Sequence, residues 1–378
     1  SAIITFTVAP TTTLKLGDRM FRRGPPTIAP TSEWLGRAVN AFGEPIDNLG
    51  RLARGREPVA VRGPPPAALD RRLVSTGVST GVKVVDLFTP LCVGQRMGVF
   101  AGSGVGKSTL LNMLTRADRF ELTVVGLIGE RGREVREFID QLDAAARSRL
   151  IIVVATSDES ALQRRMAAET TMAVAEHFRN LGHSVLAILD SVTRFALACR
   201  EIAIAAGEPP VSRGFPPSVF TALPLLLERA GPGPEGAGDI TAVFSVLVDG
   251  DDHNDPIADA VRGIVDGHIV LDRAVATQGR YPAVNIPASI SRLAHVALTP
   301  ERLALATRLR AMIARYEESR DLRTMGGYVA GLDADLDAAV AIVPLLYANL
   351  AQSTEDPPSV DAFRDVTEAL KRQTAPLT

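Results

Sequence analysis

Five near-continuous hydrophobic runs dominate the middle of the chain and predict the strands of a sheet. They cover residues 97–101, 122–128, 150–155, 185–189 and 240–248. Segments with a helical spacing of apolar residues lie between them, most clearly at 160–181 and 193–206. Strands that are apolar on both sides are typical of a sheet with both faces covered, so the pattern predicts a mainly parallel α/β core.

The two ends of the chain differ from this core. Up to about residue 60, short strand candidates at 5–9 and 35–40 alternate with turn sequences such as Gly43-Glu44-Pro45. Pro64-Pro65-Pro66 predicts a stiff linker, and the glycine-rich stretch 231–238 predicts a flexible loop. The pattern beyond Pro300 is helical, with helices expected at 301–320, 332–350 and 359–372.

Composition narrows the class of protein. The 378 residues are 22% charged and 46% hydrophobic, as in an ordinary soluble domain, and the net charge of -2 gives no basic excess for nucleic acid. Cys92 and Cys199 lack metal-ligand spacing and fit a reducing, cytoplasmic compartment. No apolar run reaches the ~20 residues that span a bilayer. The first residue is Ser1, not Met, and a strand-like run follows, which is typical of a truncated chain.

The sharpest motif is a phosphate-binding loop. Small residues between an apolar run and a helix let consecutive N–H groups point at a phosphate, and the helix N-terminus favours the same charge. Lys107 supplies a cation for the β- and γ-phosphates of ATP, and the Ser108 hydroxyl is placed to ligate Mg²⁺. Ala101 replaces the usual first glycine, and the alternative is a turn that binds nothing. The expected nucleotide-binding residues are Gly102, Ser103, Gly104, Val105, Gly106, Lys107, Ser108 and Thr109.

Two carboxylates follow apolar runs. Asp190 ends the 185–189 run, where a parallel sheet places its ligands, and would hold the magnesium shell. Glu130 follows the 122–128 run and can polarise the water that attacks ATP. The alternative is that Glu130 and Glu134 only pair with Arg131 and Arg133 at a helix start, and spacing alone leaves both interpretations open.

Several stretches in a fixed order carry a family resemblance. They are 70–86, the loop 101–108, 129–131, 190–194, 281–283 and 289–292. Together they resemble the rotary-type ATPases, which include the catalytic subunit of F-type ATP synthase. Residues 207–210, 213–218 and 251–259 look most like the type III export ATPases of that family, and 255–264 resembles the flagellar form more than the virulence form.

The resemblance implies a RecA-like P-loop core and roles for single residues. Glu130 would be the catalytic carboxylate, and Arg131 and Arg194 would lie near the γ-phosphate. Arg292 would be an arginine finger that enters the site of a neighbouring subunit. Tyr281 would stack on adenine. Without the resemblance, Arg292 would be interpreted as part of a surface ion pair and Tyr281 as a packing residue.

The resemblance also implies a domain order and partners. Residues 1–66 would be a partial β-barrel and linker, 67–300 the ATPase domain, and 301–378 a helical domain facing a stalk or cargo. There the acidic residues Asp333, Asp335 and Asp337 are expected first as a solvated face and second as a contact surface.

The implied activity is ATP hydrolysis by a homohexameric ring that energises flagellar protein export. The ring would be cytoplasmic and peripheral at the inner-membrane export gate. Its implied partners are an export regulator, a stalk protein, gate components, chaperones and export substrates, with no nucleic acid. A virulence secretion system is the alternative setting.

Two other functional classes compete with this interpretation. A non-catalytic nucleotide-binding subunit of a rotary ATPase would lack the carboxylate that Glu130 provides. A ring-shaped RNA translocase would need an RNA platform of interleaved aromatic and basic residues. The first sixty residues offer only Phe6, Phe21, Trp34 and Phe42.

Overall fold

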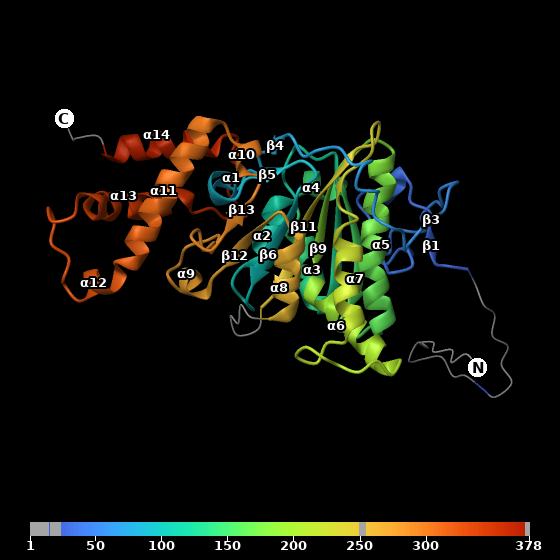
Figure 1. Cartoon of the computed structure of the whole chain (residues 1–378). Helices are drawn as coiled ribbons and strands as arrows, with labels where there is room; N and C mark the ends of the chain where they lie inside the picture. Colours follow the sequence, from blue (N-terminus) through green and yellow to red (C-terminus); the bar gives the residue numbers. More distant parts are fainter. Residues whose placement is uncertain (1–14, 16–23, 249–254, 375–378) are drawn as a thin grey trace.

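A mainly parallel sheet forms the centre of the molecule (Figure 1). The computed structural model describes residues 15, 24–248 and 255–374, and within these ranges the sheet has nine strands in the order β13-β12-β6-β11-β9-β7-β8-β2, with β10 paired to β11. Only β10 and β13 run antiparallel to their neighbours. The strands are β2 (Ala38–Val39), β6 (Arg96–Ala101), β7 (Leu122–Glu130), β8 (Leu150–Thr156), β9 (Ser184–Asp190), β10 (Gly231–Pro232), β11 (Asp239–Leu247), β12 (Gly267–Leu271) and β13 (Ile290–Ser291).

The five predicted apolar runs all form buried strands, and their ends agree with the prediction within two residues. Successive side chains of one strand enter two different cores. Val125 and Leu127 of β7 belong to one core, whereas Val124 and Ile128 belong to the other. Both faces are therefore covered, which confirms the α/β class and explains why the runs are apolar at every position.

Helices cover the two faces of the sheet. The first core contains side chains from α1 (Lys83–Phe88), α2 (Lys107–Leu114), α3 (Gly132–Asp140) and α4 (Ala144–Ser148). The second core contains side chains from α5 (Ala161–Asn180), α6 (Val192–Ala205), α7 (Pro217–Leu227) and α8 (Pro256–Ile264). Ser160 begins α5 with a capping box, because its hydroxyl accepts from the Gln163 N–H while the Gln163 side chain accepts from the Ser160 N–H.

The N-terminal part contributes an antiparallel pair and an edge strand. β1 (Thr27–Ile28) pairs with β3 (Val59–Ala60), while β2 joins the central sheet beside β8. The strand expected at 35–40 is therefore only two residues long, and the one expected at 5–9 lies outside the described residues. A short 3-10 helix, η1 (Ser32–Trp34), precedes β2, and β4 (Gly77–Val78) pairs with β5 (Leu91–Cys92).

The glycine-rich stretch at 231–238 is not entirely a loop. Gly231 and Pro232 form β10 and pair with Ile240 and Asp239 of β11, so the stretch extends the sheet before turning. The loop is therefore shorter than predicted, because the backbone at the start of the segment has sheet partners.

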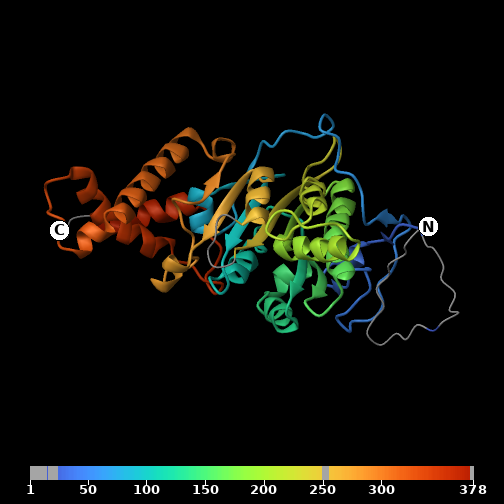
Figure 2. The same cartoon turned by 60° about the horizontal axis from the view of Figure 1, so that its bottom comes forward.

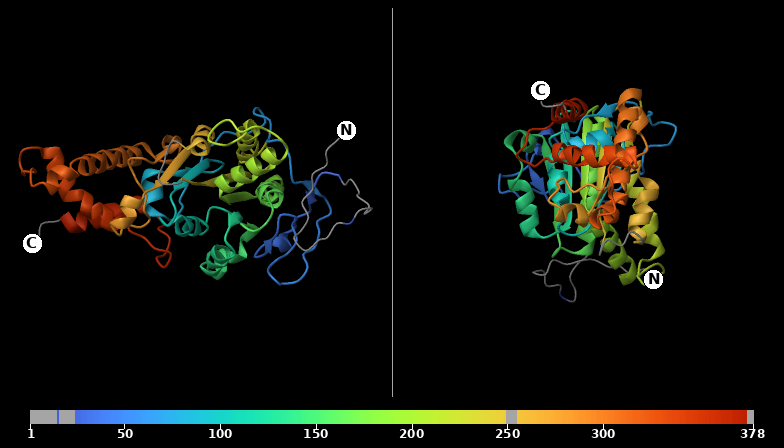
Figure 3. Two further views of the ribbon diagram at one scale, coloured as in Figure 1. Left: turned by 90° about the horizontal axis from the view of Figure 1, so that it is seen from below. Right: turned by 90° about the vertical axis from the view of Figure 1, so that its left-hand side faces the viewer.

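The C-terminal helices extend from one end of the sheet, and the N-terminal strands lie at the other end (Figures 2 and 3). The described residues contain no helix long and apolar enough to cross a membrane. The short helices α9 (Arg273–Thr277) and α10 (Ala294–Ala297) lead into this part. The remaining helices are α11 (Pro300–Glu318), α12 (Arg320–Thr324), α13 (Ala334–Leu350) and α14 (Ala362–Thr374).

Two predictions for this C-terminal part need correction. The last helix begins at Ala362 rather than at 359, because the Asp361 carboxylate accepts from the Arg364 N–H and ends the extended segment. Asp333 caps α13 through the Leu336 N–H, and Asp337 accepts from the Tyr328 hydroxyl at 2.6 Å. These two acids therefore have partners within the chain rather than forming a purely solvated face.

Candidate active site

The P-loop lies at the carboxyl edge of the sheet, between β6 and α2. Gly104 and Gly106 have φ angles of 76° and 94°, a left-handed conformation that glycine adopts without a Cβ clash. Val105 between them is buried, so this side chain anchors the loop and only its backbone faces the site. Beside the loop is a cavity of about 510 Å³. Its lining residues are Gly102, Ser103, Gly104, Gly106, Lys107, Ser108, Thr109, Glu130, Arg131, Glu134, Arg194, Leu247 and Val248.

Lys107 lies between two carboxylates at the floor of the cavity. Its Nζ is 2.5 Å from Asp190 Oδ1 and 3.4 Å from Glu130 Oε1. Burial lowers the pKa of Lys107, but the charges of Asp190 and Glu130 outweigh it and raise that pKa overall. The three side chains come from α2, β9 and the end of β7, and the pairing of Leu127 with Asp190 sets β7 beside β9. The order of the strands in the sheet thus brings the three predicted side chains together.

Glu130 binds a proton more tightly than an ordinary glutamate. Burial and the neighbouring charge of Asp190 raise the pKa of Glu130 to about 7, although Lys107 acts in the opposite direction. Glu134, which also lines the cavity, contributes to the rise in that pKa. A carboxyl group that titrates near neutral pH is suited to accept a proton from water during hydrolysis.

The two predicted arginines of the site differ in environment. Arg194 lies in the first turn of α6 with its stem against Gly129, and its buried Nε has no hydrogen-bond partner among the described residues. A buried donor without an acceptor favours an anion at that place. The side chain of Arg131 is 81% exposed and lies 4.0 Å from Glu134, a loose pair at the cavity rim.

Ser108 and Asp190 carry the types of oxygen donor that a magnesium ion shared with a nucleotide would require; Ser108 lines the cavity, whereas Asp190 lies buried behind Lys107. The Ser108 side chain is exposed at the start of α2, and hydroxyl and carboxylate oxygens are ligands that Mg²⁺ prefers. Among the described residues, no three His, Cys, Asp or Glu side chains form a metal cluster. The remaining ligands would therefore be phosphate oxygens and water.

Tyr281 lies close to the P-loop although it is far away in sequence. A Cβ added to Gly106 would be 3.6 Å from a ring carbon of Tyr281, and 46% of Tyr281 is exposed. The carbonyl of Tyr281 accepts a 2.9 Å hydrogen bond from the Gln352 N–H, so the C-terminal part holds this segment. The placement brings a half-exposed aromatic residue beside the phosphate loop.

Arg292 is not part of this cavity. The preceding residue, Ser291, pairs with Gly267 at the start of β12, whereas Ala101 before the P-loop pairs with Leu271 at its end. These two positions lie at opposite ends of β12, which is roughly 13 Å long at ~3.3 Å per residue. Arg292 is exposed and its Nη2 donates to the Arg262 carbonyl at 3.3 Å. It therefore lies outside the P-loop cavity of its own chain.

The sequence prediction missed three residues that line the cavity, Glu134, Leu247 and Val248, and also Ser245, which is buried behind Asp190. Ser245 of β11 donates a 2.6 Å hydrogen bond to Asp190 Oδ1, and Glu134 lines the cavity directly. The signal for Ser245 was a lone hydroxyl residue inside the apolar run 240–248. Glu134 was considered only as an ion-pair partner, since its position one helical turn beyond Glu130 gave no sign of the cavity.

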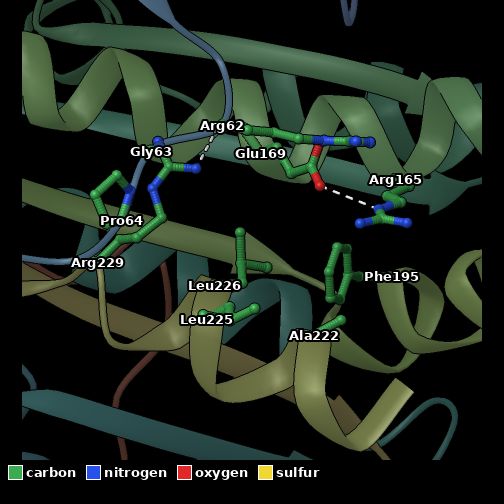
Figure 4. Close-up of a pocket in the computed structure, with 10 residues that line it drawn as sticks. All are labelled: Arg62, Gly63, Pro64, Arg165, Glu169, Phe195, Ala222, Leu225, Leu226 and Arg229. Atoms are coloured by element: carbon green, nitrogen blue, oxygen red, sulfur yellow. Dashed lines mark hydrogen bonds and ion pairs between the residues drawn. The ribbon is translucent and has the colours of Figure 1, made fainter. Parts of the chain in front are cut away.

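A second cavity, of about 290 Å³, lies between α5, α6, α7 and the segment after β3 (Figure 4). Arg62 and Arg165 both point toward Glu169, at 2.7 and 3.1 Å, and Phe195 lies across the hollow. The cavity contains no part of the P-loop. Its charges are matched within the chain, so it supports no nucleotide chemistry.

Comparisons of the sequence match known families over most of the chain. Residues 81–291 match the ATP synthase alpha/beta family, nucleotide-binding domain, and residues 298–369 match the T3SS EscN ATPase C-terminal domain. A flagellum-specific ATP synthase of Rhizobium meliloti is 55% identical, covering 98% of this chain and 79% of its own length. A type 3 secretion system ATPase of Xanthomonas euvesicatoria is 44% identical, covering 93% and 79%.

Solved structures agree with these matches. The assembled ATPase EscN from the type III secretion system of enteropathogenic Escherichia coli aligns with a TM-score of 0.86 at 41% identity, over 92% of this chain and 84% of EscN. EscN in complex with its central stalk EscO aligns with a TM-score of 0.83 at 40% identity, over 92% and 82%.

Proposed function

We propose that this chain, which belongs to the ATP synthase alpha/beta family, acts as the ATPase that energises flagellar protein export. The observation that carries the proposal is the convergence of Lys107, Glu130 and Asp190 beside the P-loop cavity. The flagellar setting is supported by the 55% identity to a flagellum-specific relative against 44% to a secretion ATPase.

In the proposed mechanism, the P-loop N–H groups and Lys107 bind the β- and γ-phosphates. Glu130 in its carboxylate form orients a water for attack on the γ-phosphate and takes up its proton. Arg194 donates from its buried Nε to the phosphate, and Arg131 closes the cavity rim. A magnesium ion held by Ser108 and Asp190 would neutralise charge on the phosphates.

The proposed active form is a homohexameric ring. Arg292 is exposed at the edge of the sheet opposite to its own P-loop, so it is available to a neighbouring copy. In a head-to-tail ring every subunit offers the same surface to the next one, which places one finger at each site. An arginine finger is worth ~10³–10⁵ in rate, so an isolated subunit should be slow.

The proposed partners follow from the same assignment. The EscN complex with its central stalk supports a stalk protein as a partner, and we extend the proposal to an export regulator, gate components, chaperones and export substrates. The proposed location is the cytoplasm, peripheral to the inner-membrane gate. We also keep the division into residues 1–66, 67–300 and 301–378 as a proposal.

The test is phosphate release from Mg-ATP by wild type, Glu130→Gln and Arg292→Ala over a protein dilution series. Both variants should lose turnover and retain ATP binding, and wild-type activity per mole should rise with concentration. Activity per mole that stays flat into the ring-forming range argues against a finger in trans. An assembled wild type without turnover would leave a nucleotide-sensing subunit as the function.

A further inference from the structure

Arg310 of α11 has an unusual set of partners for an arginine. Its Nη1 donates to the carbonyls of Ile286 and Ser289, the latter at 2.7 Å, and its Nη2 donates to the Phe88 carbonyl at 2.6 Å. All of its hydrogen-bond acceptors in the described part of the chain are backbone carbonyls. Burial without a carboxylate lowers the pKa of Arg310. A half-buried guanidinium whose acceptors are all carbonyls holds backbone segments in place rather than neutralising a charge.

The carbonyls that Arg310 holds belong to the chain that leads to Arg292. Ser289 is three residues before Arg292, and its hydroxyl accepts from the Val270 N–H at 2.9 Å and donates to the Asn285 carbonyl at 2.6 Å. Arg310 therefore fixes a turn that is already fastened to β12. The next residues form β13, and Arg292 follows directly.

The segment after α1, whose Phe88 carbonyl Arg310 binds, also contacts the segment that leads to Arg292. Phe88 ends α1, and two residues later the Pro90 carbonyl accepts a 2.7 Å hydrogen bond from the Ser291 hydroxyl. Gln95 Nε2 also donates to that hydroxyl, at 3.1 Å. The side chain of Ser291, the residue before Arg292, is thus held by Pro90 and Gln95. Arg310 bridges the segment of Phe88, which leads to Pro90, and the segment of Ser289, which leads to Arg292.

We propose that Arg310 is a positioning residue for Arg292, and that it links the C-terminal helices to the active site of the neighbouring subunit. The proposal rests on the ring mechanism with Arg292 acting in trans. α11 packs against α13, so a shift of the C-terminal helices moves the guanidinium and with it the carbonyls of Ile286 and Ser289. A displacement of a catalytic group by ~1 Å can cost about 10²-fold in rate.

If Arg310 only stabilised the fold, subunits carrying Arg310→Met would not regain activity when mixed with Glu130→Gln subunits. Mixed rings therefore distinguish a positioning role from a purely stabilising one. In a random one-to-one mixture of Glu130→Gln and Arg292→Ala subunits, about one quarter of the interfaces combine an intact site with an intact finger. This pair must recover activity toward about a quarter of the wild-type level if Arg292 acts in trans. Failure of this control pair would contradict the ring mechanism, independently of Arg310.

The variant to test is Arg310→Met, which keeps the aliphatic stem and removes the donors. Alone, it should lose at least about tenfold in turnover with ATP affinity unchanged, because its own site is intact. Mixed with Glu130→Gln subunits it should recover activity, since those subunits supply a correctly placed finger. Mixed with Arg292→Ala subunits it should stay inactive, since no interface then has a correctly placed finger.

Two further variants complete the experiment. Arg308→Met is the matched control, because Arg308 is exposed on the same helix and should keep wild-type activity. Arg310→Lys keeps the charge without the planar fork, and it carries the test if Arg310→Met fails to fold. Wild-type turnover in the Arg310 variants, recovery with Arg292→Ala subunits, or no recovery with Glu130→Gln subunits in rings where the control pair recovers, would each overturn the proposal.

Discussion

The buried hydroxyl of Ser245 donates a 2.6 Å hydrogen bond to Asp190 Oδ1. Lys107 Nζ lies 2.5 Å from the same oxygen, so two donors from β11 and α2 hold the carboxylate at the end of β9. Ser245 is fully buried, and its hydroxyl can reach the site only through Asp190. The arrangement fixes the orientation of the carboxylate that we propose for the magnesium shell.

The first prediction concerns this hydrogen bond. Ser245→Ala should raise the Mg²⁺ concentration required for ATP hydrolysis by about tenfold, because outer partners of metal ligands typically contribute about 10–100-fold in affinity. The measurement is a Mg²⁺ titration of turnover at fixed ATP. Ser245→Thr, which keeps a hydroxyl, is the control, and an unchanged titration for Ser245→Ala would argue against the role.

The second prediction concerns pH and activity. Because the pKa of Glu130 is raised to about 7, the carboxylate that accepts the proton of water is depleted below neutral pH. Turnover should therefore rise with pH and level off above about 8. The pH profile of phosphate release measures this, and a profile that is flat between pH 6 and 8 contradicts the assignment of Glu130 as the base.

The same pKa has a consequence for stability, and its sign is opposite. A carboxyl whose pKa is raised on folding binds more protons in the folded state than in the unfolded state. The folded protein therefore loses stability as the pH rises from 4.5, the ordinary pKa of the group, to about 7, its pKa in the folded state. Glu130→Gln cannot ionise and should gain in melting temperature relative to wild type over this range. The test is the melting temperature of both proteins without nucleotide as a function of pH. A difference in melting temperature that stays constant from pH 5 to 7 would contradict the burial of a titrating Glu130.

A further experiment addresses Arg194, whose buried Nε has no hydrogen-bond partner in the part of the chain that the structure describes. Arg194→Gln should weaken binding of a non-hydrolysable ATP analogue by about tenfold or more while ADP affinity changes little, because a charged hydrogen bond contributes about 1.5–3 kcal/mol. Arg200→Gln on the same helix is the control, since that guanidinium lies over Phe215 instead. Equal losses for ATP analogue and ADP would place Arg194 elsewhere than at the γ-phosphate.

A further prediction is that ATP binding requires an aromatic side chain at position 281. If its ring stacks on adenine beside Gly106, Tyr281→Ala should weaken ATP binding by about 1–3 kcal/mol, the usual range for stacking of a base on an aromatic ring. Tyr281→Phe should bind ATP nearly as well as wild type. Calorimetric titration of both variants with ATP decides this, and wild-type affinity in Tyr281→Ala rules out stacking.

The fold itself contains a buried ion pair that can be tested apart from catalysis. Arg229 Nη2 lies 2.5 Å from Glu176 Oε2, with side chains only 2% and 10% exposed, and Arg229 Nη1 also donates to the Val61 carbonyl. Glu176→Gln should lower the free energy of unfolding by about 3–5 kcal/mol, since it leaves a buried charge unpaired.

The matched control for this prediction is an exposed pair. Arg133 and Glu137 lie 2.6 Å apart on the surface of α3, with side chains 87% and 50% exposed. Glu137→Gln should therefore change the free energy of unfolding by under about 1 kcal/mol in the same urea titration. Similar effects of Glu176→Gln and Glu137→Gln would mean that the Arg229 pair is not desolvated as the structure has it.

The sequence by itself determined those features that depend on neighbouring residues. The P-loop follows from the spacing of Gly104, Gly106 and Lys107, because backbone freedom and a helix N-terminus are local properties. The buried strands follow from apolar runs, and the α/β class follows from their continuity. The ends of helices were predicted less accurately than the strands. The start of α14, for example, depends on whether Ser359 or Asp361 caps the helix, and in the structure it is Asp361.

Only the tertiary structure decided which strand ends meet. Periodicity identifies β7, β9 and β11 as strands but contains no information about their order, so the contact of Ser245 with Asp190 could not be predicted. Arg292 had an assigned role from resemblance, yet its place at the opposite edge of the sheet required the antiparallel pairing of β13. Arg310 has the sequence context of any helix arginine. Its function depends on carbonyls more than twenty residues away, and such long-range backbone contacts leave no local pattern.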